Sequence, residues 1–129
     1  MSVKIIYFVH GTTLDNLEHK ATGWLPGTLS EKGIYQSFAL KKLINMNEID
    51  LVISSDLKRA IMSAENIFKG EKDIFHDERI RECNYGDLNG KDNSLVKYEE
   101  HINEKEAINN DWRKSKAWQP GWIYEIKSI

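Results

Sequence analysis

The sequence predicts a single α/β domain with a mostly parallel sheet. Residues 50–55, DLVISS, are apolar and β-branched like a buried strand, and apolar residues recur after them at the three- and four-residue spacing of a helix. Residues 3–9, VKIIYFV, form a second run of strand length that is nearly continuous in apolar residues. Two strands connected through a helix pair in parallel, so we expect these two strands to run side by side in the same direction.

The composition is that of an ordinary globular protein. A chain of 129 residues can bury one hydrophobic core, so we expect one domain over residues 1–129. Charged residues make up 29% of the chain and the net charge is -2, which argues against a nucleic-acid or membrane surface. The single cysteine, Cys83, excludes an internal disulfide and a cysteine-rich metal site. We therefore expect a cytoplasmic protein that uses no metal ion or other cofactor.

The first apolar run leads into a long loop. Residues 3–9 are predicted to form a central strand that is buried on both faces. Residues 11–33 contain glycines and a proline among polar residues, which predicts a long loop over one end of the sheet. His10 falls where the strand meets this loop, and Gly11 directly after it would let another group approach the backbone closely.

Two amphipathic helices are predicted after the loop. The first begins at Ser30, a preferred N-cap residue, with Glu31 in its first turn, and the second follows residues 50–55. The positions expected to face the core are Tyr35, Phe38, Ala39, Leu43 and Met46 in the first helix, and Leu57, Ala60, Ile61, Ala64, Ile67 and Phe68 in the second.

The remaining segments carry weaker patterns. Residues 73–80 predict a short edge strand, and residues 81–91 predict an irregular loop. Charge dominates from residue 89 to residue 110, where we expect at most a poorly packed helix. Residues 122–126 alternate between apolar and polar side chains, as a half-buried strand does.

Three chemically capable residues are predicted to meet at one edge of the sheet. His10 follows the first strand, and Arg59 lies in the first turn of the second helix, where its planar guanidinium and the helix dipole both favour an anion. Successive N–H groups in the turn after His10 can form an anion-binding nest. Glu82, in the loop after the edge strand, can supply a general acid or base. The set is suited to a phosphate group.

Each of these residues also has a purely structural interpretation. A histidine at a strand end is often a hydrogen-bonded spacer, and Arg59 could be a solvated helix residue. Glu82 could simply pair with Arg79 or Arg81. Their convergence at the carboxyl edge of a parallel sheet, where such folds bind ligands, favours the functional interpretation.

Four segments resemble, in order, the motifs of the histidine phosphatase, or phosphoglycerate mutase-like, superfamily. They are VHGTTLDN at 9–16, TGWLPGTLSEKGIYQSFAL at 22–40, SSDLKRAIMSAENI at 54–67 and DERIRECNYGDLNG at 77–90. The resemblance covers about residues 3–90, and the DWRK and KAWQPGW segments within residues 111–122 also resemble a subgroup. It implies a three-layer α/β/α fold with a mostly parallel sheet.

The resemblance also implies a reaction and a site. His10 would attack phosphorus and carry the phosphoryl group until water releases it, and Glu82 would protonate the leaving oxygen. Arg59, Gly11 and Asn16 would bind the phosphate. The function implied is that of a phosphomonoester hydrolase without a metal, acting on a phosphorylated small molecule or a phosphoprotein.

Two departures from the family pattern affect this expectation. Val9 stands where the family usually has an arginine, and Lys20 is a candidate to replace that charge. The family's second histidine, on a later strand, has no counterpart, so we expect an internal deletion near residues 102–106. The other histidines fall outside the motif and are expected to be structural or solvated: His19, His76 and His101.

These departures keep a second function open. A chain that retains the phosphate site but lacks the second histidine would be a catalytically impaired, phosphate-binding pseudoenzyme. A missing strand would also expose apolar flanks of the sheet, which favours a homodimer or an exchange of elements with a second copy.

Overall fold

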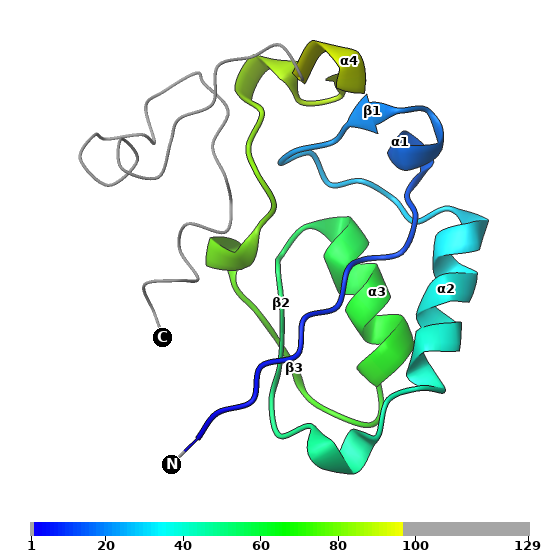
Figure 1. Ribbon diagram of the computed structural model, residues 1–129, viewed down its shortest axis with the longest axis vertical. Coiled ribbons are helices and arrows are strands. Elements are labelled where there is room, and N and C mark those ends of the chain that lie inside the picture. The colour runs from blue at the N-terminus through cyan, green and yellow to red at the C-terminus, as the bar shows by residue number, and fades with distance from the viewer. Residues whose placement is uncertain (1, 97–129) are drawn as a thin grey trace.

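The computed structural model describes residues 2–96, and over this range the chain is an α/β fold of short strands and helices (Figure 1). Its helices and strands are α1 (Leu14–Leu17), β1 (Lys20–Ala21), α2 (Glu31–Lys41), β2 (Val52–Ser54), α3 (Lys58–Phe68), β3 (Ile74–His76), β4 (Lys91–Asp92) and α4 (Asn93–Val96). Short 3-10 turns lie at Met46–Glu48, Glu78–Ile80 and Gly86–Leu88. No helix in this range is both long and apolar enough to cross a membrane.

Strands β2 and β3 form a parallel pair connected through α3. Val52 lies opposite Ile74, and Ser54 lies opposite His76. The N–H of Asp77 extends the pairing by donating to the Ser54 carbonyl at 2.9 Å. The predicted strand within residues 50–55 and the helix after it are thereby confirmed, and the predicted edge strand within residues 73–80 is present in a shorter form.

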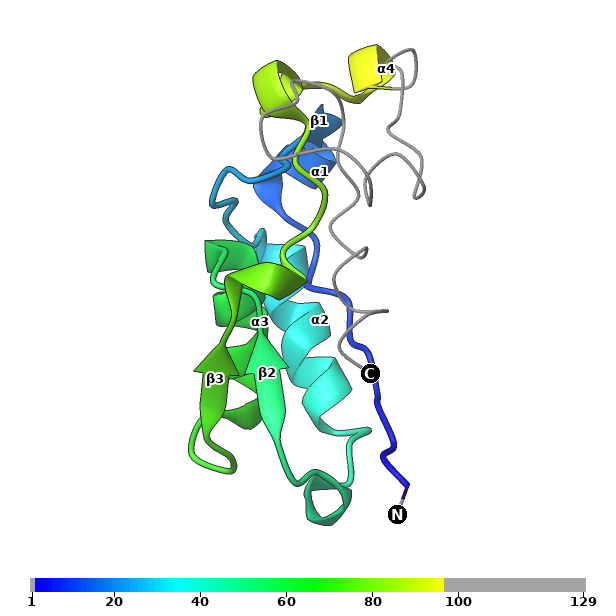
Figure 2. The same cartoon turned by 90° about the vertical axis from the view of Figure 1, so that its left-hand side faces the viewer.

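Helices α2 and α3 pack together and lie behind the β2–β3 pair in Figure 2, so both cover the same face of the strands. Val52 of β2 packs against Ile67 and Phe68 of α3 to form the core. Partly buried side chains complete it: Leu40, Ile44, Met46, Ile49 and Ile74. On the opposite face of the pair, Ile53 is 51% exposed and Phe75 is 56% exposed.

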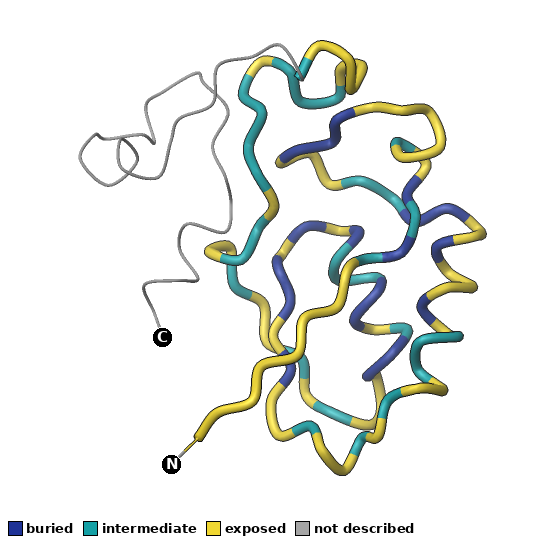
Figure 3. Tube along the Cα trace, viewed as in Figure 1, coloured by how far each residue is buried: buried dark blue, intermediate teal, exposed yellow. Residues whose placement is uncertain are grey.

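The prediction of a central strand at residues 3–9 is wrong. This segment has no regular structure, and its residues are exposed, as the yellow colour in Figure 3 shows. Within residues 2–96 it has no backbone hydrogen-bond partner, and the partner of β2 in this range is β3. An apolar run becomes a strand only when a neighbour satisfies its N–H and C=O groups. Phe8 reaches the core, with its ring centroid 6.2 Å from that of Phe68.

Helix α2 begins as predicted but turns a different face inward. Ser30 caps it by accepting a hydrogen bond from the Gly33 N–H at 3.1 Å. Its buried residues are Gly33 and Ser37, whereas the predicted core positions Tyr35 and Phe38 are 76% and 48% exposed. In α3 the predicted face is confirmed at its most buried positions: Ala64, Ile67 and Phe68, with Leu57 at the N-cap.

A close backbone contact explains the orientation of α2. A Cβ atom on Gly33 would lie 2.1 Å from the carbonyl oxygen of Thr12, and one on Gly11 would lie 2.4 Å from the carbonyl oxygen of Gly33. Both distances are far below van der Waals contact, so only glycine fits on either side. The bulky apolar residues of α2 must therefore face away from this contact.

The segments beyond the described range remain predictions. They include the part of the 89–110 helix that follows Val96, the alternating strand at residues 122–126 and the internal deletion near residues 102–106.

We expect Gly33→Ala to destabilise the protein by about 2 kcal/mol, since overpacking outweighs the better helix propensity of alanine. Chemical denaturation measures the change in the free energy of unfolding. Gly70→Ala is the control, because a Cβ there meets no atom within 4 Å and only the positive φ of 83° is penalised. A Gly33→Ala protein as stable as the unmodified chain would contradict the close contact.

Candidate active site

The loop over residues 11–30 is ordered by hydrogen bonds between its two ends. The Ser30 N–H donates to the Thr12 carbonyl at 2.9 Å, and the Leu14 N–H donates to the Thr28 carbonyl at 3.0 Å. Thr13 is fully buried, and Leu29 is 4% exposed. The predicted long loop is therefore a packed unit, and its central part, residues 22–27, lies against the N-terminal end of α3 through Arg59.

His10 precedes this loop, and its ring is held in one orientation by the backbone. Its Nδ1 lies 2.7 Å from the carbonyl oxygen of Gly11. A carbonyl oxygen can only accept a hydrogen bond, so Nδ1 carries the hydrogen and Nε2 of the neutral ring keeps its lone pair. The ring is half-buried. Nε2 is therefore the basic and nucleophilic atom of this side chain.

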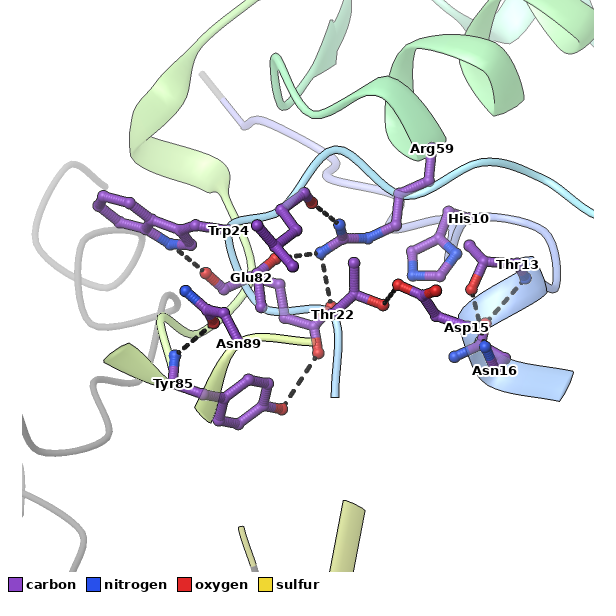
Figure 4. Close-up of polar contacts among 12 residues, drawn as sticks. His10, Thr13, Asp15, Asn16, Thr22, Trp24, Arg59, Glu82, Tyr85 and Asn89 are labelled. Carbon is purple, nitrogen blue, oxygen red and sulfur yellow. Dashed lines mark hydrogen bonds and ion pairs between the residues drawn. The ribbon is translucent and has the colours of Figure 1, made fainter. Parts of the chain in front are cut away.

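Ser63 of α3 ties the His10 turn to the first turn of the same helix. The Gly11 N–H donates to Ser63 Oγ at 3.0 Å, and Ser63 Oγ donates to the Arg59 carbonyl at 2.9 Å. Figure 4 shows the His10 ring beside the Arg59 side chain, whose guanidinium turns toward the loop carbonyls and Glu82. His10 thus reaches the site through a side-chain link to α3, and not through a strand paired with β2.

The Arg59 side chain is buried, with 2% of its surface exposed, and it holds the 22–27 part of the loop. Its Nη1 donates to the carbonyl of Leu25 at 2.8 Å and, more weakly, to that of Pro26 at 3.4 Å. Its Nη2 donates to the carbonyl of Gly23 at 2.7 Å. A buried guanidinium must have acceptors for its donors, and this loop supplies most of them.

Glu82 completes the set of acceptors around Arg59. Its Oε2 lies 3.1 Å from Arg59 Nη2, and its Oε1 accepts a longer bond from the Tyr85 hydroxyl at 3.4 Å. The carboxylate side chain is 46% exposed, so one side of this ion pair is open to solvent. The structure therefore brings Arg59 and Glu82 into direct contact, as Figure 4 shows.

The alternative partners considered for Glu82 are engaged elsewhere. Arg79 pairs with Asp77 at 2.6 Å, and this pairing lowers the pKa of the Asp77 carboxyl to about 2. Arg81 forms a bidentate pair with Asp56, in which Nε lies 2.6 Å from Oδ1 and Nη2 lies 2.5 Å from Oδ2. The suggestion that Glu82 pairs with Arg79 or Arg81 is therefore wrong.

The N–H groups after His10 do not form an open nest. The Gly11 N–H is bonded to Ser63, the Thr12 N–H donates to Gln36 Oε1 at 2.9 Å, and the Thr13 N–H donates to Asn16 Oδ1 at 2.9 Å. Buried donors need acceptors, and here side chains provide them. The structure thus places Gly11 against Ser63 of α3, with its N–H already engaged.

Asn16 acts in the structure as part of a helix cap. Its own N–H donates to Thr13 Oγ1 at 3.0 Å while its Oδ1 accepts from the Thr13 N–H, a reciprocal capping box that starts α1. Next to it, Asp15 Oδ2 accepts from the Thr22 hydroxyl at 2.8 Å. Figure 4 places Asp15 and Asn16 next to His10, and no sequence pattern indicated Asp15 as a member of this cluster.

The other candidate residues lie outside this cluster of bonds. Lys20 pairs with Glu18 at the surface, and that contact raises the pKa of Lys20. His19 is exposed and has a left-handed backbone, with φ of 56°. His76 Nδ1 lies 2.8 Å from Ser54 Oγ at the end of β3. Among residues 2–96, no group of three His, Cys, Asp or Glu side chains is arranged to hold a metal ion.

An α/β fold that carries a histidine, a buried arginine and a glutamate at one end of a parallel strand pair defines a candidate phosphate-handling protein. The sequence matches the model of the histidine phosphatase superfamily (branch 1) over residues 6–125. The chain belongs to this family.

Relatives of known sequence are phosphoglycerate mutases. The chain is 32% identical to a 2,3-bisphosphoglycerate-dependent phosphoglycerate mutase of Bifidobacterium longum, over 93% of the chain and 50% of the mutase. It is 34% identical to the corresponding protein of Streptococcus agalactiae, over 88% of the chain and 50% of that protein. The chain thus spans about half the length of these curated relatives.

Similar solved structures include a phosphatase and a mutase. A mycobacterial glucosyl-3-phosphoglycerate phosphatase in complex with VO3 superposes with a TM-score of 0.63 and 31% identity, over 67% of this chain and 42% of the phosphatase. A phosphoglycerate mutase from Bacillus anthracis gives a TM-score of 0.61 and 29% identity, over 67% of this chain and 40% of the mutase.

The hydrogen bond to Gly11 predicts the tautomer of His10. In long-range nitrogen-15 NMR spectra recorded where the ring is neutral, we expect Nδ1 to give the signal of a protonated nitrogen and Nε2 that of an unprotonated one. The signals are assigned by their loss in His10→Gln. A protonated Nε2 in the neutral ring would contradict this arrangement.

Proposed function

We propose that the chain is a phosphomonoester hydrolase that works through a phosphohistidine at His10. The observation that carries the proposal is the bond from His10 Nδ1 to the Gly11 carbonyl, which leaves the Nε2 lone pair available for attack on phosphorus. The Nε2–P bond forms as the P–O bond to the leaving alcohol breaks. Water then cleaves the Nε2–P bond and returns His10 to its starting state.

Arg59 and Glu82 have different roles in this reaction: Arg59 binds the phosphate, and Glu82 supplies a proton. The Arg59 guanidinium is fixed by the carbonyls of Gly23 and Leu25, whereas the Glu82 carboxylate is half-exposed and can rotate away. An incoming phosphate oxygen takes the place of the Glu82 carboxylate at Arg59 Nη2, because both are anionic acceptors for the same donor. The displaced Glu82 carboxylate then takes up a proton from solvent, and the resulting carboxyl group donates this proton to the leaving oxygen.

Specific observations favour the alternative of a phosphate-binding pseudoenzyme. The Nη1 and Nη2 donors of Arg59 are bonded within the protein, as are the N–H groups of Gly11, Thr12 and Thr13. Val9, at the position where the family usually has an arginine, is 85% exposed and contributes no charge. A phosphate bound under these conditions would have fewer donors to stabilise the charge of the transition state.

Hydrolysis is proposed ahead of mutase activity because the Glu82 side of the site is open to solvent. A mutase must protect its phosphorylated intermediate from water between two half-reactions. The proposed substrates are a phosphorylated small molecule or a phosphoprotein, and the proposed location is the cytoplasm. Gly11 and Asn16 are proposed to contact the phosphate once it is bound.

We propose a three-layer α/β/α arrangement for the complete sheet. The exposed apolar side chains of Ile53 and Phe75 support it, since the face opposite α2 and α3 carries apolar surface for a further layer to cover. The exposed apolar residues 3–9 support the proposal of a homodimer, since an unpaired extended segment can pair with a second copy.

The assay of His10→Ala separates the two functions. We expect the unmodified chain to hydrolyse 4-nitrophenyl phosphate and His10→Ala to lose this activity by at least about 10³-fold, since the nucleophile is removed. His76→Asn is the control, and it should retain activity. Vanadate binding without hydrolysis in the unmodified chain would instead support the pseudoenzyme, and hydrolysis that survives in His10→Ala would refute the phosphohistidine mechanism.

The competition at Arg59 predicts opposite effects of one substitution. In Glu82→Gln the competing negative charge is absent, so we expect inorganic phosphate to bind about tenfold more tightly, as measured by calorimetry. Hydrolysis should fall by about 10²-fold or more, because the proton donor is lost. Unchanged phosphate affinity would show that the phosphate does not replace Glu82 at Arg59.

A further inference from the structure

A second ion pair connects the two segments that carry Arg59 and Glu82. Arg81, directly before Glu82, forms a bidentate pair with Asp56, three residues before Arg59, at distances of 2.6 and 2.5 Å. The side chains of Arg81 and Asp56 are 23% and 35% exposed, so the pair is partly shielded from solvent. Because a bidentate pair fixes both distance and orientation, it sets how the two segments lie relative to each other.

Asp56 is available for this pair because it does not cap α3. An aspartate just before a helix commonly accepts N–H bonds from the first turn. Here the N-cap is Leu57, which has no side-chain cap, and the Asp56 carboxylate is directed to Arg81. The hydrogen bonds from Arg81 hold the pKa of the Asp56 carboxyl below its usual range. The pair therefore stabilises the fold when Asp56 is ionised, and this contribution is lost as the pH falls below the ordinary pKa of 3.8.

Trp24 joins this pair to the backbone of Glu82. The Arg81 guanidinium carbon lies 4.9 Å from the centroid of the Trp24 ring, which is within the range of a cation–π contact. The indole Nε1–H of Trp24 donates to the carbonyl oxygen of Glu82 at 2.8 Å. Trp24 also lies between Gly23 and Leu25, whose carbonyls accept from Arg59. The same short loop therefore contacts both members of the Arg59–Glu82 pair.

We propose that Asp56, Arg81 and Trp24 are positioning residues that hold the backbone of Glu82 so that its carboxyl group meets the phosphate bound at Arg59. Glu82 needs this support because it lies between two 3-10 turns, outside any helix or strand. Its side chain can leave Arg59 when phosphate binds, while its backbone stays bonded to Trp24. The proposal rests on the hydrolase function proposed above.

The test uses the full chain with Asp56→Asn, Arg81→Lys and Trp24→Phe. Each removes one link: the charge on Asp56, the planar fork of Arg81 or the indole donor. Asp77→Asn is the matched control, because it also removes the charge of an aspartate that pairs with an arginine, in this case Arg79. Among the described residues, the Asp77–Arg79 pair makes no direct bond to Trp24 or Glu82. Thermal unfolding confirms that each variant is folded before it is assayed.

The expected result is a loss of turnover with little change in binding. We expect kcat for 4-nitrophenyl phosphate to fall about tenfold to a hundredfold in the three variants, since displacement of a reacting group by about 1 Å has effects of this size. Phosphate affinity should change much less than in Glu82→Gln, because the competing carboxylate is still present, and the pH–rate profile should differ from that of the unmodified chain. Variants that match Asp77→Asn in kcat and pH profile would overturn the proposal.

A second readout separates this proposal from the proposed function. We expect the indole N–H NMR signal of Trp24, assigned by its loss in Trp24→Phe, to shift in Asp56→Asn and Arg81→Lys, and the carbon-13 signal of the Glu82 carboxyl to shift as well. Asp77→Asn should change neither. If the unmodified chain is inactive, the hydrolase function fails, but these signals still report whether the three residues position Glu82. Signals identical to those of the unmodified chain would refute the positioning role.

Discussion

The buried guanidinium of Arg59 is the interaction on which the rest of the site depends. A desolvated cation is tolerated only when its donors are satisfied, and here the carbonyls of Gly23, Leu25 and Pro26 and the carboxylate of Glu82 satisfy them. Residues 22–27 of the loop contain no helix or strand, so these hydrogen bonds determine the conformation of the backbone there. The conformation of the loop and the position of Glu82 are therefore consequences of the same buried charge.

Local patterns were enough to predict part of the fold. Three predicted features are set by residues that are close together in the sequence, and the structure contains all of them. They are the apolar strand within residues 50–55, the helix after it and the Ser30 cap. The predicted strand at residues 3–9 depended on a distant partner, which no local pattern specifies. The face of α2 was missed because the contact of Gly33 with Gly11 requires small residues, and hydrophobic spacing does not report that requirement.

The arrangement of the candidate site residues differs from the one that the sequence led us to expect. From the sequence, His10 and Arg59 are expected to meet at the ends of two parallel strands. The parallel strands are β2 and β3, and the residues that follow them are Arg59 and Glu82, which are in contact. His10 arrives through Gly11 and Ser63. No sequence signal identified Asp56 as a partner of Arg81, because an aspartate before a helix has the pattern of a cap.

The small separation of the two parallel strands along the sequence has a consequence for the order of folding. Strands β2 and β3 are joined through α3 between residues 52 and 76, so their association closes a small loop and costs little chain entropy. Contacts between residues close in sequence form fastest, so we expect this unit to assemble first. Arg59 would then remain hydrated until residues 23–26 dock. The late step in folding is thus the one that removes water from the arginine.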